Sequence, residues 1–448
     1  MIHLAWDPGP RFLAAASIIG SLAIAGCGGA GASGAGTATS SPDEYVVERS
    51  VENDIETVRT ISGSRWGGRA TLVEELSIGD ESGQDAYLFG SISAAWATED
   101  RIYVVDAQVP TVRAFDLEGE YLFDLGNPGQ GPGEYGIPSA VAVTSDGRVL
   151  VADAMNARIN VYDAEGGFVE DWPLASQKSA LGLTLGTDGE IYTQSWSLDE
   201  GRMGIQAVGP DGLIGVILFP PQIEFEPATV PIGKGLDMIL PFAPRYTWAF
   251  APGGAVVAGA GEQYRFEVHR QDGTVTAIEH RSEPVVVEAK EAEFRALLAS
   301  RSLRLMSPDL SIGRGDLPRH KPAFSSFYPD RAGRVWVVRQ GPGRPDPQCI
   351  DADAAASPRL LRATAAGTNF EIGSKPGPWD SDALEGKCWA DTYTFDLFDI
   401  ATGDFLGTVA ATELGFRIPL FAGDETVLAA VADELGTIRL KKYRLQID

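Results

Sequence analysis

The sequence predicts an all-β protein, a six-bladed β-propeller closed by strands from the two ends of its folded part. Three observations lead to this fold class: a stretch that reads as one four-stranded sheet, a second copy of it at a fixed offset, and turn signals that recur along the chain. With 44% hydrophobic residues, 52 Gly and 28 Pro in 448 residues, the composition is typical of a folded protein rich in turns.

The clearest sheet pattern runs from Gly126 to Trp172. Read at period two, it gives three apolar strands, separated by Asp146-Gly147 and by residues 153–156, and a fourth strand after Glu165-Gly166. A single sheet of this kind cannot bury both of its faces, so the pattern requires neighbouring sheets of the same kind.

A second copy of this pattern precedes it in the chain. A shift of 47 residues places Asp106 on Asp153 and residues 102–105 on residues 149–152. So many matches at one offset indicate a true internal repeat.

Later copies are less regular but keep the same turns. Six turns of Gly, Asn or Asp character are predicted between a first and a second strand, and five between a third and a fourth. The last copy ends at its third strand, 438–447, whereas the early strand 72–78 has no sheet of its own. Pairing these two strands would close the ring and remove both open edges. The first kind of turn falls at Glu99-Asp100, Asp146-Gly147, Asp188-Gly189, Gly253-Gly254, Ala332-Gly333 and Gly423-Asp424, and the second near Gly119, Gly166, Gly212, Gly273 and Gly403.

Three stretches within the predicted propeller, residues 71–448, depart from the repeat. Residues 222–244 are rich in proline and lie between the third and fourth blades. Residues 288–305 have apolar side chains at helical spacing and predict a helix that lies against the propeller. Residues 341–387 interrupt the fifth blade as a long insertion.

The beginning of the chain predicts an exported protein. Residues 12–25 form a short apolar run followed by Gly26-Cys27, and Ile24-Ala25-Gly26-Cys27 resembles the bacterial lipobox. This resemblance implies that residues 1–27 are a signal peptide, that Cys27 is lipidated, and that the protein is anchored to a bacterial membrane on its periplasmic or outer-membrane face. The alternative is an ordinary cleaved signal in which Cys27 is incidental. Residues 28–70 are expected to be a flexible tether and lead-in, because residues 28–42 contain only small residues and proline.

The charge of the chain argues against nucleic acid as a partner. The formal net charge is −26, and an acidic surface of this size repels phosphate backbones.

The second blade resembles the NHL repeat. This resemblance rests on a glycine-rich segment at 126–129, the Asp146-Gly147 turn, Val151-Ala152-Asp153, and the run from Asn156 to Asp163. The whole chain is similar to bacterial six-bladed β-propeller lipoproteins, which implies a fold and an extracytoplasmic location but no shared activity.

Cationic residues are expected at one mouth of the central channel, where propellers place many of their ligand sites. They precede the innermost strand of a blade or end its second strand, and with Tyr246 they form a candidate site for an anionic or carbohydrate-acid ligand. The alternative is that these cations pair with nearby carboxylates. Aromatic side chains near the same mouth would form a binding platform or pack between blades. The cations are Arg245, His320, Lys321, Arg339 and Arg417, and the aromatic residues are Tyr135, Tyr246, Trp248, Phe324 and Phe327.

Asp106 and Asp153 are candidate ligands for a divalent cation, since carboxylates on successive blades can face one channel. The other blades do not repeat them, and a structural role is the alternative: hydrogen bonds to backbone N–H groups of the loop that follows each residue. The four histidines show no metal-ligand spacing, and no G-x-S-x-G motif is present. The cofactor, if any, therefore stays open.

Two cysteines remain after Cys27, namely Cys349 and Cys388, at the two ends of the insertion in the fifth blade. A disulfide between them would tie the base of the insertion and contribute about 3–4 kcal/mol by loop closure. Two free thiols are the alternative.

Three functions remain open from the sequence. The first is a membrane-anchored propeller that binds a protein, peptide or saccharide on one face of its ring. The second is a metal-dependent enzyme of the lactonase or lyase type at the channel mouth, and the third is a structural part of an envelope complex.

Overall fold

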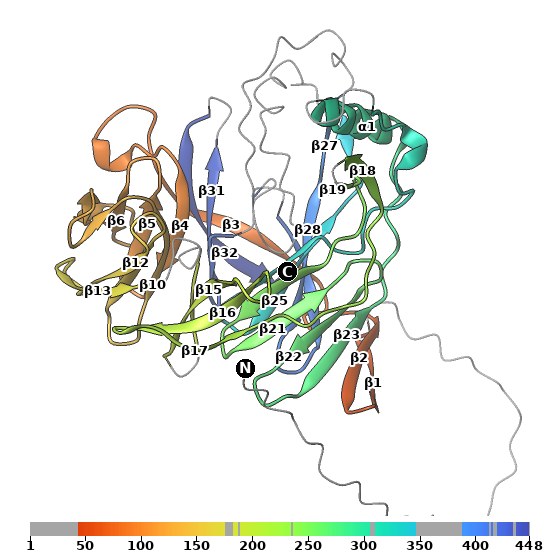
Figure 1. Cartoon of the computed structure of the whole chain (residues 1–448), viewed down its shortest axis with the longest axis horizontal. Coiled ribbons are helices and arrows are strands. Elements are labelled where there is room, and N and C mark those ends of the chain that lie inside the picture. The colour runs from red at the N-terminus through yellow and green to blue at the C-terminus, as the bar shows by residue number, and fades with distance from the viewer. Residues whose placement is uncertain are drawn as a thin grey trace, which may run out of the picture. The chain divides into compact units, whose positions relative to one another are not determined.

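The protein is described by a computed structural model that covers residues 44–174, 182–186, 189–233, 236–304, 310–345, 388–411, 414, 419–432 and 436–447. Its folded part consists almost entirely of strands, with one α-helix among the described residues (Figure 1). Within these ranges no helix has both the length and the apolar character needed to cross a membrane.

Six four-stranded blades are present, so the predicted fold class is confirmed. In each blade the strands pair as antiparallel neighbours, and the first strand is an edge of its sheet. The first three blades consist of β4 (Ile92–Ala97), β5 (Ile102–Asp106), β6 (Thr111–Phe115) and β7 (Tyr121–Leu125); of β10 (Pro138–Val143), β11 (Val149–Asp153), β12 (Arg158–Tyr162) and β13 (Phe168–Pro173); and of β14 (Leu183–Leu185), β15 (Ile191–Ser197), β16 (Arg202–Gly209) and β17 (Gly212–Leu218).

The last three blades follow the same order. They consist of β20 (Thr247–Ala251), β21 (Ala255–Gly259), β22 (Arg265–His269) and β23 (Val275–His280); of β24 (Ser326–Pro329), β25 (Arg334–Gln340), β28 (Tyr393–Asp399) and β29 (Phe405–Ala410); and of β30 (Phe421–Ala422), β31 (Thr426–Ala432), β32 (Ile438–Ile447) and β3 (Arg69–Ile78).

The ring is closed by strands from both ends of the folded part, as the sequence predicts. Strand β3 pairs antiparallel with β32 from Ala70↔Ile447 to Ile78↔Leu440, so an N-terminal strand is the outer strand of the sixth blade. The same strand β3 pairs in parallel with β29, which joins the fifth and sixth blades into one sheet.

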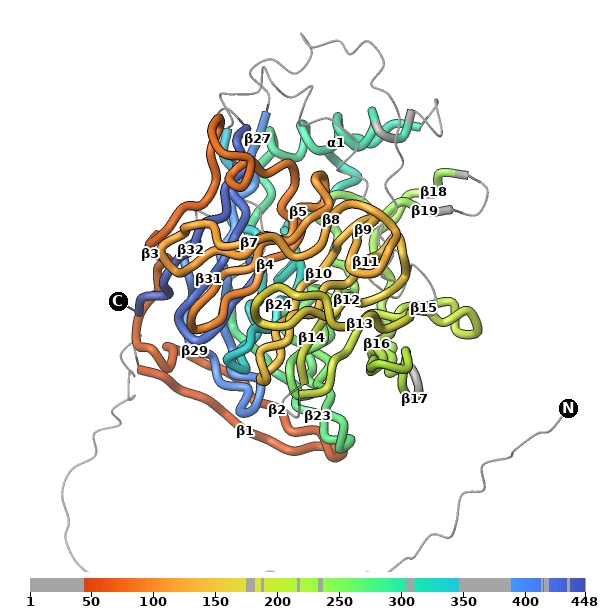
Figure 2. Tube along the Cα trace, turned by 90° about the vertical axis from the view of Figure 1, so that its left-hand side faces the viewer, coloured from red at the N-terminus to blue at the C-terminus, as the bar shows by residue number. Residues whose placement is uncertain are grey.

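The structure corrects the expectation for residues 28–70. From Val46 these residues form a hairpin of β1 (Val46–Glu52) and β2 (Ile55–Ser62), whose turn has positive φ at Asn53 and Asp54. Strand β2 pairs in parallel with β23, so the hairpin widens the fourth blade to six strands (Figure 2). The two-residue turn between apolar runs is the local signal that predicts such a hairpin.

The helix α1 (Ala289–Arg304) lies within the predicted range and is packed on two sides. One side, with Ala292, Ala296 and Leu303, packs against residues 240–243 and against Ile312 and Leu317. The other side places Phe294 against Cys388 and Trp389. Its apolar residues are therefore core rather than an open groove.

Short elements complete the described part of the chain. Two of them, β18 (Thr229–Gly233) and β19 (Leu236–Ile239), form a hairpin inside the proline-rich segment between the third and fourth blades. The insertion in the fifth blade begins at residue 341, as predicted, because Gln340 of β25 pairs with Tyr393 of β28. These elements are β8 (Asn127–Pro128), β9 (Glu134–Tyr135), β18 (Thr229–Gly233), β19 (Leu236–Ile239), β26 (Arg344–Pro345), β27 (Trp389–Ala390), and the 3₁₀ turns η1 (Asp85–Tyr87) and η3 (Arg314–Asp316).

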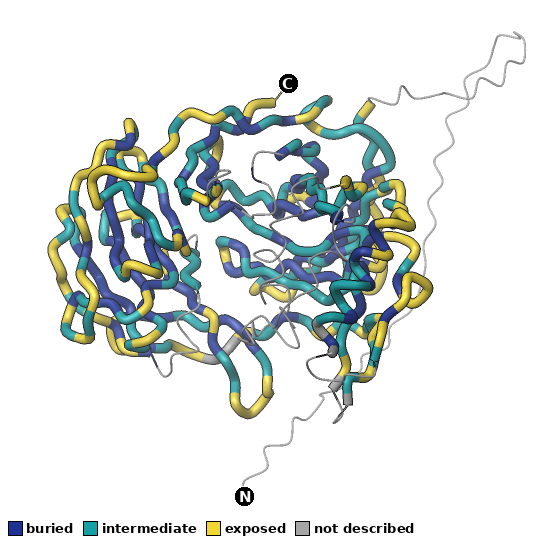
Figure 3. Tube along the Cα trace, turned by 90° about the horizontal axis from the view of Figure 1, so that it is seen from above, coloured by how far each residue is buried: buried dark blue, intermediate teal, exposed yellow. Residues whose placement is uncertain are grey.

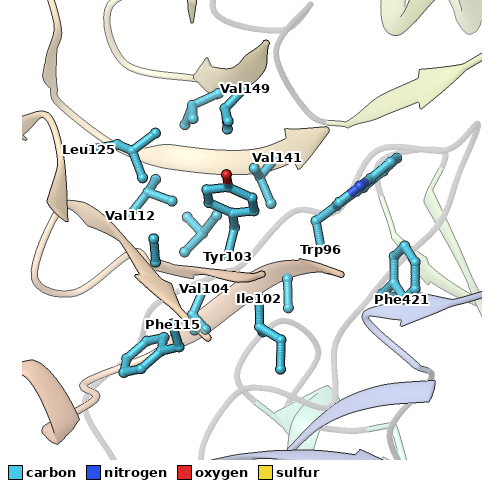
Figure 4. Packing of buried hydrophobic residues seen from close by; sticks show 14 of the residues in the cluster. Trp96, Ile102, Tyr103, Val104, Val112, Phe115, Leu125, Val141, Val149 and Phe421 are labelled. Carbon is cyan, nitrogen blue, oxygen red and sulfur yellow. The ribbon is translucent and has the colours of Figure 1, made fainter. Parts of the chain in front are cut away.

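The core lies between neighbouring blades. Second strands such as β5 and β11 are buried along their whole length, while the turns are exposed (Figure 3). In Figure 4, Tyr103, Val112 and Leu125 of the first blade lie close to Val141 and Val149 of the second. Each blade thus buries a face that it could not bury alone.

Candidate functional site

A large cavity among the described residues occupies the central channel. It has a volume of about 1580 Å³ and is lined by the first strand of every blade. Each of these strands is the inner edge of its sheet, so its inward backbone N–H and C=O groups have no neighbouring strand. The channel therefore presents peptide donors and acceptors from all six blades to whatever fills it.

The wall of the channel differs between its two sides. The first and second blades contribute mostly small side chains, among them Ala94, Ala97 and Ala140, beside the nearly buried ring of Trp96. The fourth and fifth blades contribute more aromatic residues, and Trp248, Phe250 and Tyr328 are half-buried there. Burial raises the pKa of Tyr328, which keeps the phenol neutral. This arrangement leaves room beside an aromatic surface.

One end of the channel is formed by the turns that follow the first strands. There Asp330 is 1% exposed, accepts hydrogen bonds from Trp336 Nε1 at 2.8 Å and Arg334 Nε at 2.6 Å, and takes two more from backbone N–H groups. Burial raises the pKa of Asp330, although Arg334 and Trp336 act in the opposite direction. Arg334 also donates hydrogen bonds from its two Nη atoms to the carbonyl oxygens of Gly423 and Asp424 in the sixth blade. Asp330 is thus part of the scaffold of this end.

The neighbouring Arg331 behaves differently. Its guanidinium carbon lies 4.3 Å from the ring centre of Trp96 in the first blade, and Trp96 in turn packs on Phe421 with ring centres 5.4 Å apart. Figure 4 shows Trp96 and Phe421 side by side. Arg331 belongs to the fifth blade, so its contact with Trp96 joins the fifth blade to the first at the end of the channel.

The two predicted metal ligands have other partners. Asp153 is 0% exposed and accepts hydrogen bonds from the backbone N–H groups of Gly136 and Ile137, each at 3.0 Å, and of Met155 and Asn156. Asp153 Oδ2 also accepts a hydrogen bond from Asn156 Nδ2 at 2.6 Å.

Asp106 makes the matching contacts in the first blade. It is 0% exposed and accepts from the N–H groups of Gly90, Ser91, Gln108 and Val109. These contacts support the structural interpretation of both residues, and they also reach the loop that precedes each blade. Across the described ranges, no group of three or more His, Cys, Asp or Glu side chains has the arrangement of a metal site.

The glycine-rich segment of the NHL-like motif is held by the motif's own polar residues. Arg158 Nη2 donates to the carbonyls of Gln130, Gly131 and Glu134, and Asn156 Nδ2 donates to Gly129 O at 3.1 Å. This segment is therefore a turn between blades, and the motif builds the fold.

The described members of the predicted cationic site do not assemble into one site. Lys321 Nζ lies 2.6 Å from Glu291 Oε1 of α1, with both side chains fully buried, and donates to Gly341 O at 2.8 Å. Arg339 Nη1 lies 3.3 Å from Asp396 Oδ2, and this carboxylate is buried. Lys321 and Arg339 therefore pair with carboxylates, which is the alternative that the sequence left open.

The remaining members of that predicted site lie elsewhere. His320 is exposed and forms a bridge with Val286, and Arg245 is half-buried, with a pKa that burial lowers. Tyr246 donates to Pro221 O at 2.5 Å, and burial raises its pKa to about 12. Arg417 lies outside the described residues. His320, Arg245 and Tyr246 are not among the described residues that line the cavity.

The predicted aromatic platform is divided in the same way. Tyr135 and Phe324 are buried between blades, whereas Trp248 and Phe327 line the channel.

Of the cysteines, only Cys388 lies within the described residues. It is disulfide-bonded, and it is buried against Phe294 of α1. Cys27 and Cys349 lie outside the described residues, so the pairing of Cys349 with Cys388 and the lipidation of Cys27 stay predictions.

Comparison with known proteins agrees with this architecture. Residues 82–193 match the model of family DUF5128, described as a "6-bladed beta-propeller". The chain is a six-bladed β-propeller.

Solved structures similar to this propeller have low sequence identity. A protein of Bacteroides fragilis described as exported has 11% identity and a TM-score of 0.43, with 84% of this chain and 96% of that chain covered. A DUF4221 family member from Bacteroides vulgatus has 10% identity and a TM-score of 0.43, with 85% and 99% covered. Virginiamycin B lyase from Staphylococcus aureus has 13% identity and a TM-score of 0.30, with 80% and 97% covered.

Sequence reasoning missed the end of the channel where Arg331 lies. It placed the site at the loops before the first strands, whereas the cavity also extends to the turns after them. The signal was weak: Arg331 precedes the predicted Ala332-Gly333 turn, and a single arginine in a turn does not indicate that it faces a channel.

Proposed function

We propose that this propeller is an extracytoplasmic, lipid-anchored binding protein that holds a saccharide in its central channel. The observation that carries this proposal is the cavity of about 1580 Å³, with half-buried aromatic residues of the fourth and fifth blades facing mostly small side chains of the first and second. Its volume exceeds the roughly 300–1,000 Å³ of pockets for drug-sized ligands, so it has room for several sugar rings.

The inner strand edges favour a saccharide over a peptide. A peptide pairs with one strand edge along its length, as in β-strand addition. Here six edges surround the cavity, so donors and acceptors point inward from all sides. Hydroxyl groups donate and accept hydrogen bonds in many directions, and sugar rings stack on aromatic faces such as that of Trp248.

The location is supported by the start of the sequence. The apolar run that ends at Cys27 and the segment 28–42 of small residues fit a lipidated N-terminus followed by a tether. Replacing Cys27 by serine is expected to release the protein from the membrane fraction. Unchanged membrane association of the Cys27→Ser variant would contradict the lipid anchor.

The binding function is tested with the full-length protein purified in detergent. A glycan array selects a saccharide, and isothermal titration calorimetry then compares the wild type with Trp248→Ala. Loss of one stacking surface is expected to weaken binding about 3- to 10-fold. The matched control is Phe168→Ala, an exposed aromatic residue on the outer strand β13, which is expected to leave the affinity unchanged. Absence of any saccharide binding, together with binding of extended peptides, would overturn the proposal.

A further inference from the structure

The end of the channel contains an unusual charge arrangement. Among the described residues that line the cavity, Arg331 is the only cationic one. Its guanidinium stacks on Trp96, and among the described residues no carboxylate or carbonyl oxygen accepts a hydrogen bond from its side chain. Arg334, three residues further along the chain, is paired with Asp330 instead.

Stacking gives this guanidinium a fixed position. Trp96 and Phe421 are both nearly buried and pack on each other, so they form a rigid surface beneath Arg331. The aromatic ring contacts only the flat face of the guanidinium. The N–H donors lie along the edge of the guanidinium, and this edge stays available to a ligand.

The surroundings of the guanidinium also favour an anion. Although the residue as a whole is exposed, loss of water around its charged group lowers the pKa of Arg331. This is the sign of a charge that has lost part of its hydration without gaining a partner of opposite charge. A bound carboxylate would replace the lost hydration with charge-assisted hydrogen bonds.

We propose that Arg331 is the anion-binding group of the channel and that the saccharide held there carries a carboxylate, as a uronic acid does. This inference rests on the proposed function. The guanidinium binds the carboxylate in a two-pronged geometry, while the sugar rings occupy the channel between the small and the aromatic walls. Three exposed carboxylates on neighbouring turns, Glu99, Asp424 and Glu425, also line the cavity and repel an anion, so the pairing with Arg331 has to outweigh this repulsion.

The test uses a pair of probes that differ only in charge. Trigalacturonate and its full methyl ester are titrated into the detergent-purified full-length protein by calorimetry, with chitosan trimer as a cationic probe and a tripeptide with a free carboxyl terminus as a further probe. The wild type is expected to bind trigalacturonate at least about 10-fold more tightly than the ester, because the ester cannot form the charge-assisted pair.

Variants then assign this preference to the residue. Arg331→Gln is expected to weaken trigalacturonate binding about 10-fold or more and to leave binding of the ester unchanged, while Arg331→Lys retains part of the preference. The control is Arg281→Gln, an exposed arginine outside the cavity lining, which is expected to change neither affinity. Equal melting temperatures of the variants show that the fold is intact.

Each other outcome contradicts a defined part of the argument. Equal affinity for acid and ester overturns the anionic subsite but leaves the saccharide function standing. Equal loss of both ligands in Arg331→Gln shows a structural role, and preference for the chitosan trimer shows that the carboxylates dominate. Binding of the tripeptide alone overturns the saccharide, and binding of none of the probes overturns both proposals.

Discussion

Removing the carboxylate of Asp153 tests whether the NHL-like motif builds the fold or holds a metal. In the wild type this buried group accepts five hydrogen bonds, four from backbone N–H groups and one from Asn156 Nδ2. The Asp153→Ala variant leaves these donors without their acceptor at a position that is 0% exposed.

The size of the effect follows from those contacts. A hydrogen bond to a charged group contributes about 1.5–3 kcal/mol when removed singly, but the five share one acceptor and are not additive. We therefore expect the variant to lose about 3–5 kcal/mol of unfolding free energy, the typical cost of removing one member of a buried charged network. Asp153→Asn is expected to lose a similar amount of stability, because the NH₂ group of asparagine replaces one acceptor oxygen with a donor that faces other donors.

Two assays measure this effect. Urea unfolding followed by tryptophan fluorescence gives the change in stability, and hydrogen exchange reports the loop directly. Amide protection is expected to fall for Gly136, Ile137 and Met155, whose N–H groups lose their acceptor. The control is Asp199→Ala, an exposed carboxylate that removes the same charge from a turn.

One result would refute this reasoning. If Asp153→Ala costs less than about 1 kcal/mol, keeps the protection of these amides and abolishes binding of a stoichiometric divalent cation, Asp153 is a metal ligand.

Three further predictions concern other side chains. Lys321→Met is expected to cost about 3–5 kcal/mol, because Glu291 is then buried without its partner, and adding Glu291→Leu should restore most of the stability in the same urea assay. Burial lowers the pKa of His280, so the unfolded chain takes up a proton that the folded one resists, and stability falls as pH drops below the ordinary pKa of 6.5. His280→Phe should therefore lose less melting temperature than the wild type between pH 7.5 and pH 5.5, and an equal loss would contradict this. Alkylation of the denatured, non-reduced protein is expected to label neither Cys349 nor Cys388 by intact-mass analysis, whereas two labelled thiols would exclude the disulfide.

The repeat allowed a correct prediction of fold and closure because both depend on local patterns. The offset between Asp106 and Asp153 reappears in the structure as two sets of matching hydrogen bonds. The strand 438–447 was predicted with its observed bounds, since its partner 72–78 was the one apolar strand without a sheet.

The hairpin at 46–62 was missed because its neighbours in sequence are unlike it. Small residues up to Pro42 suggested that the tether continued, although Asn53-Asp54 supplied a turn signal. Its parallel pairing with β23, more than 200 residues away, leaves no mark in the sequence.

The sequence by itself determined the strands, the turns and the closure of the ring, because alternating apolar residues and turns with positive φ act over a few neighbouring residues. Only the tertiary structure decided which charges meet. Lys321 finds Glu291 on a helix, and Arg331 of the fifth blade reaches Trp96 of the first, because ring closure brings segments together that no local pattern relates. Short-range sequence patterns therefore predict the scaffold. The channel, with Arg331 as the one cationic residue among its described lining residues, results from the packing of the six blades.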